Sequence, residues 1–283
     1  MIRRAWFGLL VLAAAAALGC STNPVTGKRE VILIPQSQEV ALGLEAAPKF
    51  EEEFSGRVPD DALQAYVRSV GNRVAAVSDR PMPYEFTLLR SDVPNAFALP
   101  GGKVYVTAGL LSLIGNERQL AAVLGHETGH VAALHNVKGL QRQMGASVFA
   151  KAVGRVLGGD QSQSAEGVAK VVAGVVTLKY GRNDEYEADQ LGVRYMAKAG
   201  YNPWGMVELL ETLMTLSGGS EGSRLAEMLS THPLTANRIE QARTTVASQH
   251  RAAAPNAADP GQAAFQQMRA RTLPFMVKQS PKK

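Results

Sequence analysis

Residues 121–134, AAVLGHETGHVAAL, form an apolar stretch that contains two histidines and one glutamate. His126 and His130 are four residues apart, so on a helix their side chains share one face, with Cβ atoms about 5–6 Å apart. Two imidazoles at this spacing can bind one zinc ion, and Glu127 between them can then act as general base on water. The alternative is a pair of core histidines that bond to backbone carbonyls. The pattern favours the zinc site.

A catalytic zinc site usually has three protein ligands and one position for water, so a third ligand is needed. Residues 181–192, GRNDEYEADQLG, place several acids on one predicted helix. Glu185 and Asp189 are four residues apart and share a face, whereas Glu187 points away from Glu185. One carboxylate can bind zinc, and the other can accept a hydrogen bond from a ligand histidine. The alternative is a solvated acidic helix N-terminus, but beside the histidine pair we favour a site of two histidines and one glutamate.

Two other arrangements of histidines agree less well with the sequence. The longer motif HExxHxxGxxH requires glycine at 133 and histidine at 136, but these residues are Ala133 and Asn136. His135 follows His130 by five residues, about 140° around a continuous helix. We therefore expect His135 to point away from the zinc, either at the surface or behind a ligand.

The helix that must carry the histidines has its own signals. Asn116 is a predicted N-cap, Glu117 follows it in the first turn, and the apolar run after them predicts a helix over 117–135. Gly125 and Gly129 each weaken a helix interior by up to about 1 kcal/mol relative to alanine. We expect another segment to approach the helix backbone closely at these two glycines.

The remaining pattern predicts a mostly helical α+β fold with a small sheet. Turn formers and short apolar runs predict strands over 84–90 and 103–107. Apolar residues at three- and four-residue spacings predict helices; they lie within 37–78 and over 142–157, 165–180, 183–199, 203–216, 223–229 and 234–248.

Length and composition indicate one large domain with appendages, since the chain has 283 residues of which 46% are hydrophobic. The formal net charge is +5. Without Arg3 and Arg4, 28 basic and 25 acidic residues remain, which gives +3. This charge is too small to indicate nucleic-acid binding, and a basic stripe with interleaved aromatic residues is absent from the sequence.

The first twenty residues, MIRRAWFGLLVLAAAAALGC, contain two arginines, then a run of thirteen uncharged residues from Trp6 to Leu18, then Gly19 and Cys20. The apolar run is shorter than the roughly 20 residues of a membrane-spanning helix, so we expect a signal peptide over 1–19 rather than a retained membrane anchor. Cys20 is the only cysteine, and its position resembles the acylated cysteine of bacterial lipoproteins. Ser21 after it favours the outer membrane by the same resemblance, so we expect an outer-membrane lipoprotein that faces the periplasm.

We expect four segments in the domain organisation. They are the signal peptide (1–19), a tether (20–36), a domain that carries the zinc site (37–250) and a flexible C-terminal tail (251–283) that begins with the linker-like AAAPNAADPGQ.

Four separated motifs occur in an order that resembles the zinc metallopeptidases of the HtpX, BepA and LoiP type, relatives of the CAAX prenyl-protein protease. They are HETGH, the acids from Glu185 to Asp189, NAFALPGGKVYVTAGLL at 95–111 and THP at 231–233. The resemblance covers about residues 22–245. It implies a zincin-like fold of the gluzincin type, one zinc ion held by His126, His130 and Glu185, and catalysis by Glu127.

The same resemblance implies an endopeptidase in envelope protein quality control, with unfolded or misassembled proteins as substrates and the outer-membrane assembly machinery as a further partner. In such a fold, an edge strand before the active-site helix pairs with an extended substrate. We expect this strand to consist of Lys103, Val104, Tyr105, Val106 and Thr107.

His232, in the THP motif, has three interpretations that the sequence leaves open. It is a loop histidine with ordinary hydrogen bonds, a donor to the oxyanion, or a fourth ligand that plugs the zinc, as the resemblance suggests. The alternative to an enzyme is a catalytically silent zinc protein that serves as an assembly factor or holdase at the outer membrane. Glu127 argues against that alternative, because a structural zinc site requires no general base.

Overall fold

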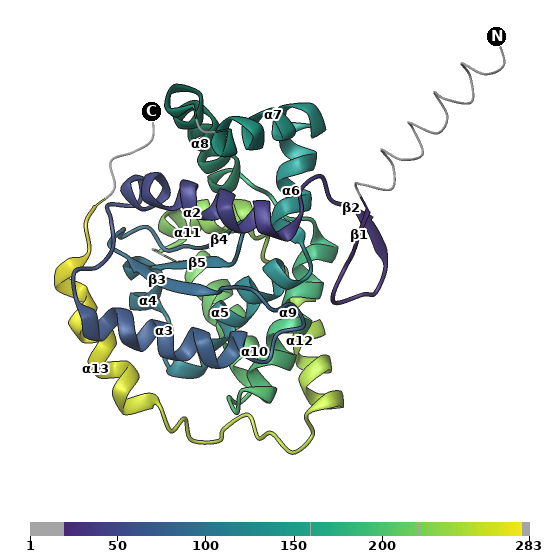
Figure 1. Ribbon diagram of the computed structural model, residues 1–283. Coiled ribbons are helices and arrows are strands. Elements are labelled where there is room, and N and C mark those ends of the chain that lie inside the picture. The colour runs from purple at the N-terminus through teal and green to yellow at the C-terminus, as the bar shows by residue number, and fades with distance from the viewer. Residues whose placement is uncertain (1–19, 159, 220, 279–283) are drawn as a thin grey trace, which may run out of the picture.

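The computed structural model describes residues 20–158, 160–219 and 221–278, and helices predominate among them (Figure 1). The mostly helical α+β class expected from the sequence is confirmed. The strands are β1 (Cys20–Thr22), β2 (Arg29–Val31), β3 (Glu85–Leu89), β4 (Ala96–Leu99) and β5 (Lys103–Thr107). The helices are α2 (Gln36–Glu53), α3 (Asp61–Ala75), α4 (Ala108–Leu113), α5 (Glu117–Ala132), α6 (His135–Met144), α7 (Ala146–Leu157), α8 (Gln161–Val176), α9 (Arg182–Lys198), α10 (Trp204–Ser217), α11 (Gly222–Thr231), α12 (Ala236–Gln249) and α13 (Gln262–Thr272), which a short 3-10 turn, η1 (Leu273–Phe275), follows.

The three-stranded sheet has the order β3-β5-β4. β5 pairs parallel with β3 and antiparallel with β4, with Tyr105 opposite Thr87 on one side and Phe97 on the other. The expectation that Lys103–Thr107 forms an edge strand is therefore wrong. The backbone of β5 already pairs with a strand on each side, so the edge strands of this sheet are β3 and β4.

Each strand of this sheet is buried on both faces because its side chains alternate between two apolar clusters. Phe86, Val104 and Ala98 face the cluster built with α3 and α5. Phe97 and Tyr105 face the other cluster, where they meet aromatic residues of α2. The sheet therefore lies between α2 on one side and α3 and α5 on the other (Figure 1).

Helices α5 and α9 pack at unusually short range. A Cβ built at Gly129 would lie 3.1 Å from the backbone oxygen of Ala188, and one built at Gly125 would lie 3.3 Å from the Cα of Gly192. The close approach expected at the two α5 glycines is thus confirmed, with α9 as the neighbour. This packing sets how near the side chains of α9 come to those of α5.

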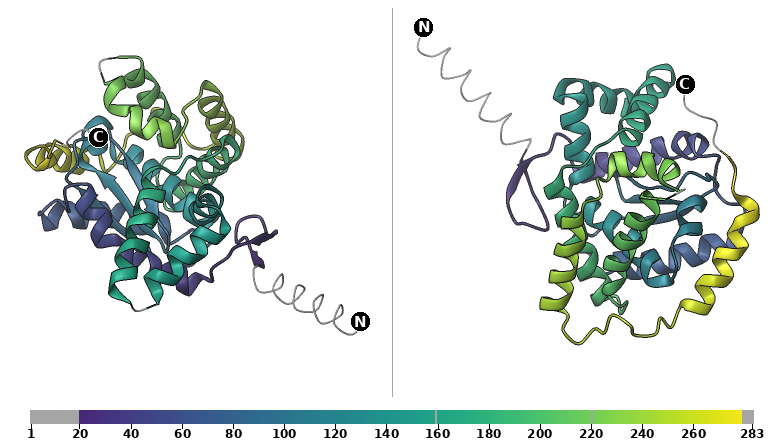
Figure 2. Two further views of the ribbon diagram at one scale, coloured as in Figure 1. Left: turned by 90° about the horizontal axis from the view of Figure 1, so that it is seen from above. Right: turned by 180° about the vertical axis from the view of Figure 1, so that it is seen from behind.

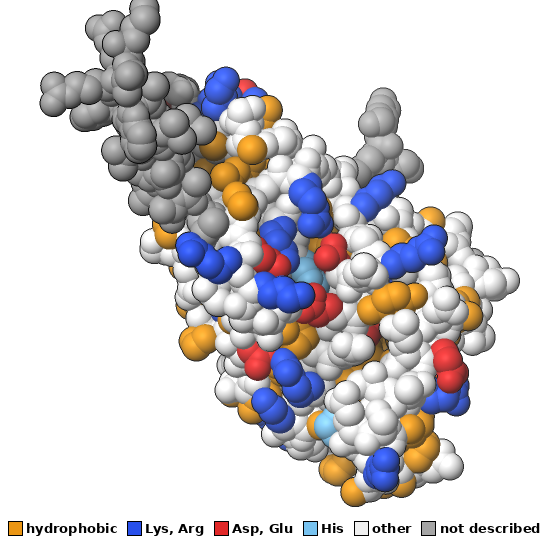
Figure 3. Space-filling view, turned by 90° about the vertical axis from the view of Figure 1, so that its right-hand side faces the viewer, with side chains coloured by type: hydrophobic (Ala, Val, Ile, Leu, Met, Phe, Trp, Pro, Cys, Tyr) orange, Lys and Arg blue, Asp and Glu red, His pale blue; other side chains and the backbone are white. Residues whose placement is uncertain are grey.

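The N-terminal hairpin of β1 and β2 contacts the start of α6 and the end of α5. Asn23 donates to the backbone oxygen of Ala133 at 3.2 Å, and Gln141 bonds to the backbones of Val31 and Leu33. Figure 3 views the molecule from this side and shows basic, acidic and apolar side chains intermixed on its surface. The predicted signal peptide, residues 1–19, is not among the described residues.

The C-terminal segment runs around the body from α12 to the far side of α3 and α4 (Figures 1 and 2). The expectation of a flexible tail over 251–283 is wrong for most of this segment. Phe265 of α13 is fully buried in the main core cluster, and Val277 donates to the backbone oxygen of Arg90 at 2.8 Å. Trp204 holds the preceding loop through a hydrogen bond to the oxygen of Ala253 at 2.9 Å. The linker-like AAAPNAADPGQ is followed by α13, and the burial of Phe265 docks this helix on the core.

Two further differences concern helices. The helix expected over 142–157 is divided into α6 and α7 at Gly145, whose φ of 76° few other residues adopt. α4 was not expected, since its six residues are too few for periodicity to show. No described helix combines the length and apolarity that crossing a bilayer requires.

Candidate metal centre

α5 carries the two histidines and the glutamate of the HETGH motif through the centre of the molecule. Asn116 caps it as expected, accepting from the backbone N–H of Gln119 at 2.9 Å. Every residue of the helix except Arg118 is buried. The polar side chains of His126, Glu127 and His130 are therefore held in a core helix, where each requires a partner.

Four side chains converge beside this helix. One ligand atom each from His126, His130, Glu185 and His232 lies within 4.8 Å of the others. The two ligand-facing histidine nitrogens, both Nε2, are 3.0 Å apart, and His130 Nε2 is 3.3 Å from Glu185 Oε1. The structure thus brings together the three residues expected to bind zinc. It also adds His232, whose place the sequence left open.

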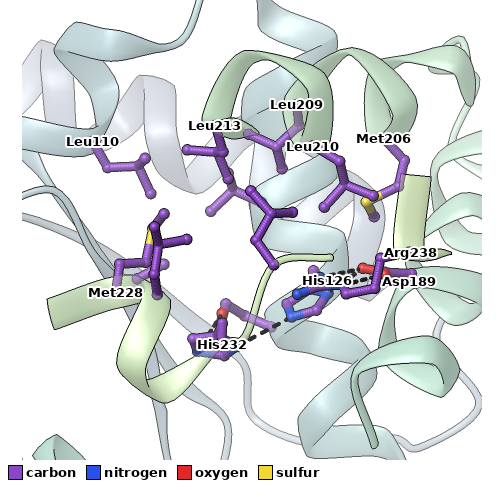
Figure 4. A pocket seen from close by; sticks show the side chains of 15 residues that line it. Leu110, His126, Asp189, Met206, Leu209, Leu210, Leu213, Met228, His232 and Arg238 are labelled. Carbon is purple, nitrogen blue, oxygen red and sulfur yellow. Dashed lines mark hydrogen bonds and ion pairs between the residues drawn. The ribbon is translucent and has the colours of Figure 1, made fainter. Parts of the chain in front are cut away.

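His126 is held from behind by Asp189, as the shared helix face of Glu185 and Asp189 suggested. Its Nδ1 is 2.9 Å from Asp189 Oδ1. Arg238 of α12 donates two hydrogen bonds of 2.8 Å to the same carboxylate and so also holds Asp189 in place (Figure 4). An ionised carboxylate accepts, so Nδ1 carries the proton and Nε2 is left with a free lone pair.

Arg238 is a residue of the site that sequence analysis missed. It also forms an ion pair with Glu185, and its side chain is only 5% exposed. Nearby Asp189 and Glu185 outweigh its burial and raise its pKa, so it is a permanent buried cation. It lies five residues after the THP motif, but nothing in the sequence around it indicated this role.

The structure decides between the two positions expected for His135. It is 1% exposed and lies behind His130 rather than at the surface, with its Nδ1 3.1 Å from Nδ1 of His130. The angle of about 140° assumed a continuous helix, but α5 ends at Ala132 and Leu134 adopts a left-handed φ of 64°. This turn brings His135 back beside His130. Glu187 does point away from Glu185, as expected, and meets His135 at 3.2 Å.

His232 lies at the end of α11, opposite α5. Its Nδ1 is 3.0 Å from Glu185 Oε1 and 3.4 Å from Nε2 of His126, while its Nε2 is 3.8 Å from Glu127. Burial alone would lower the pKa of His232, but the adjacent Glu185 and Glu127 raise it above its usual value. It therefore belongs to the group by position and is not a loop histidine apart from the site.

The charges of the cluster suit a divalent cation. Glu127, Glu185 and Asp189 are buried acids, and Arg238 is the one guanidinium among them, so three negative charges and one positive charge leave −2 when all four are ionised. Leaving such charge unpaired in a core is costly. Glu127 Oε2 is buried and has no hydrogen-bond partner among the described residues. Two imidazoles, a carboxylate and this imbalance together match a zinc site.

The pKa directions agree with this arrangement. Burial raises the pKa of Glu127. Burial also acts to raise the pKa of Glu185, but His232 and Arg238 outweigh it and hold that pKa well below its usual value. Burial and the nearby His126 lower the pKa of His130 well below 6.5, so His130 is neutral. A neutral imidazole and an ionised carboxylate are the forms that bind metal ions.

An apolar pocket opens beside Glu127 and His126. Its walls come mainly from α10 and α11, with Leu210, Leu213 and Met228 among the labelled side chains that point into it (Figure 4). Ala96 of β4 contributes another wall. The polar centre therefore adjoins a cavity that suits an apolar side chain.

Comparison with known proteins agrees with this geometry. Residues 61–246 match the model of peptidase family M48, and this range contains every member of the ligand group. The chain is 30% identical over 243 residues to the Beta-barrel assembly-enhancing protease of Escherichia coli (strain K12), a match that covers 82% of this chain and 48% of that protein. It is 31% identical over 223 residues to the Mitochondrial metalloendopeptidase OMA1 of Schizosaccharomyces pombe, covering 77% and 64% of the two chains.

A third relative, the Metalloprotease YcaL of Escherichia coli (strain K12), is 30% identical over 186 residues, which is 66% of this chain and 69% of the relative. The chain spans about half the length of the bacterial assembly-enhancing proteases it matches. The matched range includes both the HETGH helix and the helix with Glu185, and it stops short of α13. The chain belongs to peptidase family M48.

Proposed function

We propose that this protein is a zinc-dependent endopeptidase that hydrolyses peptide bonds in unfolded or misassembled proteins of the cell envelope. The observation that carries the proposal is the convergence of His126, His130 and Glu185 within 4.8 Å, with Glu127 on the same helix. In this assignment the three residues hold one zinc ion. The ion supplies Lewis acidity toward water and toward the scissile carbonyl.

Glu127 is the proposed general base. It accepts a proton from the attacking water and donates it to the leaving amine. Its Oε2 is free of hydrogen bonds to the described residues, which leaves a lone pair available for this transfer. Burial raises its pKa, which brings it nearer to the range where one carboxyl group can both accept and donate.

The remaining residues position these groups. Asp189, backed by Arg238, keeps His126 in the tautomer whose Nε2 can bind metal. We propose that His232 is a fourth ligand of the resting site, because its Nδ1 lies among the ligand atoms. A catalytic site requires one position for water, so His232 must then leave the group during turnover.

The substrate-binding elements follow from the sheet order and the pocket. We propose β4 in place of β5 as the strand that pairs with an extended substrate, since β4 is an edge strand and its Ala96 lines the same pocket as Glu127. Main-chain pairing provides affinity with little sequence selectivity. The apolar pocket then accepts a side chain next to the scissile bond.

For localisation, we propose a signal peptide over 1–19, acylation of Cys20 and attachment to the outer membrane on its periplasmic side. The support is the sequence pattern around Cys20. A relative named for enhancing β-barrel assembly suggests the same compartment and the outer-membrane assembly machinery as a partner. Radiolabelled palmitate should be incorporated by the wild type and not by a Cys20→Ala variant. We further propose 20–36 as a tether and 37–250 as the peptidase domain.

A second candidate is a zinc-binding assembly factor without protease activity. The position of His232 favours it, because four protein ligands are typical of structural zinc sites. The two candidates differ in what they require of Glu127.

The test compares casein cleavage and zinc content in the wild type and in Glu127→Gln. The endopeptidase assignment requires a loss of about 10²–10⁴ in rate with zinc retained. Glu240→Gln is the matched control, because the Glu240 side chain is 73% exposed on α12, and it should cleave as the wild type does. Equal cleavage by the wild type and Glu127→Gln would refute the mechanism, and absence of cleavage from all three zinc-loaded proteins would support the assembly factor.

A further inference from the structure

His135 and Glu187 form a polar pair behind His130 that the proposed mechanism does not use. His135 Nε2 is 3.2 Å from Glu187 Oε2, and its Nδ1 is 3.1 Å from His130 Nδ1. His135 is 1% exposed, whereas the Glu187 side chain is 32% exposed. The three residues Glu187, His135 and His130 thus form a hydrogen-bond chain that leads from solvent to the ligand group.

The hydrogen bonds of this chain have one consistent direction when both imidazoles are neutral. The Glu187 side chain is 32% exposed, and a carboxylate that reaches solvent is ionised at neutral pH, so Glu187 only accepts. His135 then carries its proton on Nε2 and offers a lone pair on Nδ1. His130 must in turn donate from Nδ1 to His135, which leaves Nε2 of His130 bare. That nitrogen faces Glu185 Oε1 at 3.3 Å, among the ligand atoms.

The opposite direction is incompatible with metal binding. If His135 donated from Nδ1, His130 would have to accept at Nδ1 and carry its proton on Nε2. The Nε2–H would then point into the ligand group, where it could bond to Glu185 but could not bind a cation. The direction of this chain therefore decides whether His130 can be a ligand.

His130, like His126, is linked through its Nδ1 to a carboxylate, but the link is indirect. His126 reaches a carboxylate, Asp189, directly at 2.9 Å, whereas His130 reaches Glu187 through an intervening imidazole. The Tyr180 ring stacks on His130 with centroids 3.9 Å apart. Ring stacking restricts tilt, and the hydrogen bond to His135 fixes rotation of the His130 ring about its own axis.

We propose that His135 and Glu187 are a positioning pair that holds His130 in the Nδ1–H tautomer with its Nε2 directed at the metal. The inference rests on the proposed role of His130 as a zinc ligand. It gives His135 a role that no motif in the sequence assigns. Outer groups of this kind typically contribute about ten- to hundredfold to metal affinity.

The experiment measures the zinc dissociation constant by competition with a chromophoric chelator, in the wild type, His135→Leu and His135→Gln. His135→Leu removes both hydrogen bonds and should weaken zinc binding about ten- to hundredfold. Glutamine keeps one acceptor for His130 and one donor for Glu187, so His135→Gln should recover most of the affinity. His250→Leu, at the end of α12, is the matched control and should bind zinc as the wild type does.

Nitrogen-15 NMR of His130 gives a readout that a purely structural role would not change. The wild type should show the Nδ1–H tautomer, and His135→Leu should show a mixture of tautomers. If His135→Leu does not fold, Glu187→Ala provides the test. The Glu187 side chain is partly exposed, so its removal leaves no buried cavity. Glu187→Ala should also weaken zinc binding several-fold.

The outcomes separate this proposal from the proposed function. Wild-type zinc affinity and an unchanged His130 tautomer in the folded His135 or Glu187 variants would overturn the positioning pair, and the Glu127 mechanism would stand. If the wild type itself binds no zinc, the proposed function fails first and the positioning pair fails with it.

Discussion

Replacing Gly129 with valine tests whether the close packing of α5 and α9 holds Glu185 at the metal centre. The Cβ atom of any larger residue at this position would lie 3.1 Å from both the Ala188 oxygen and the Leu191 Cβ. Carbon atoms in contact normally lie about 3.5–4.0 Å apart. These atoms of α9 must therefore give way by a few tenths of an ångström for this Cβ alone, and valine adds two more carbons.

This displacement is large compared with what a metal site tolerates. Ligand distances in zinc sites vary by about 0.2 Å, and Glu185 lies on α9, one turn before Ala188. We expect Gly129→Val to weaken zinc binding at least about tenfold. Overpacking should also cost about 1–3 kcal/mol of folding free energy.

The assay is chelator competition for zinc affinity, together with thermal unfolding of the zinc-free protein. The matched control is Gly154→Val, because Gly154 lies in α7 and a Cβ built there meets none of the described atoms within 4 Å. The control should leave zinc affinity unchanged. If Gly129→Val binds zinc with wild-type affinity, the contact between the helices does not position Glu185 and this reasoning is refuted.

Three further outcomes are expected. Phe265→Ala should destabilise the protein by about 3–5 kcal/mol in denaturant unfolding, because this side chain is fully buried in the main core; a change under 1 kcal/mol would mean that α13 adds little to the fold. Removal of metal with EDTA should lower the melting temperature and abolish casein cleavage, with both restored by zinc; an unchanged melting temperature would argue against a buried metal. Peptides with leucine next to the scissile bond should be cleaved with kcat/KM at least about tenfold higher than peptides with alanine there, since the pocket beside Glu127 is apolar; equal values would remove the pocket from substrate binding.

The sequence alone was sufficient for features that depend on a few neighbouring residues. The spacing of His126 and His130 places them on one face of α5, and the spacing of Glu185 and Asp189 does the same on α9, because the α-helical repeat is set by the backbone. The glycines at 125 and 129 also indicated a close neighbour. Glycine destabilises a helix interior, so two glycines in one helix are favourable only where close packing compensates.

Other features depended on where distant segments meet. Lys103–Thr107 is recognisable as a strand, but its central place in the sheet depends on pairing with both Glu85–Leu89 and Ala96–Leu99. Phe265 follows a segment of linker-like composition. Only its burial in the main core cluster shows that α13 packs against the body.

The residues of the metal centre likewise include some that the sequence predicts and some that only the tertiary structure reveals. HETGH marks two ligands and a base, whereas Arg238 and His232 reach the site from segments far along the chain. His135 is only five residues after His130, but it turns toward the site because α5 ends at Ala132. Local backbone geometry repeats within four residues and can be read from the chain directly. Contacts between distant segments are selected by burial and pairing across the whole fold, so their residues carry no local signature.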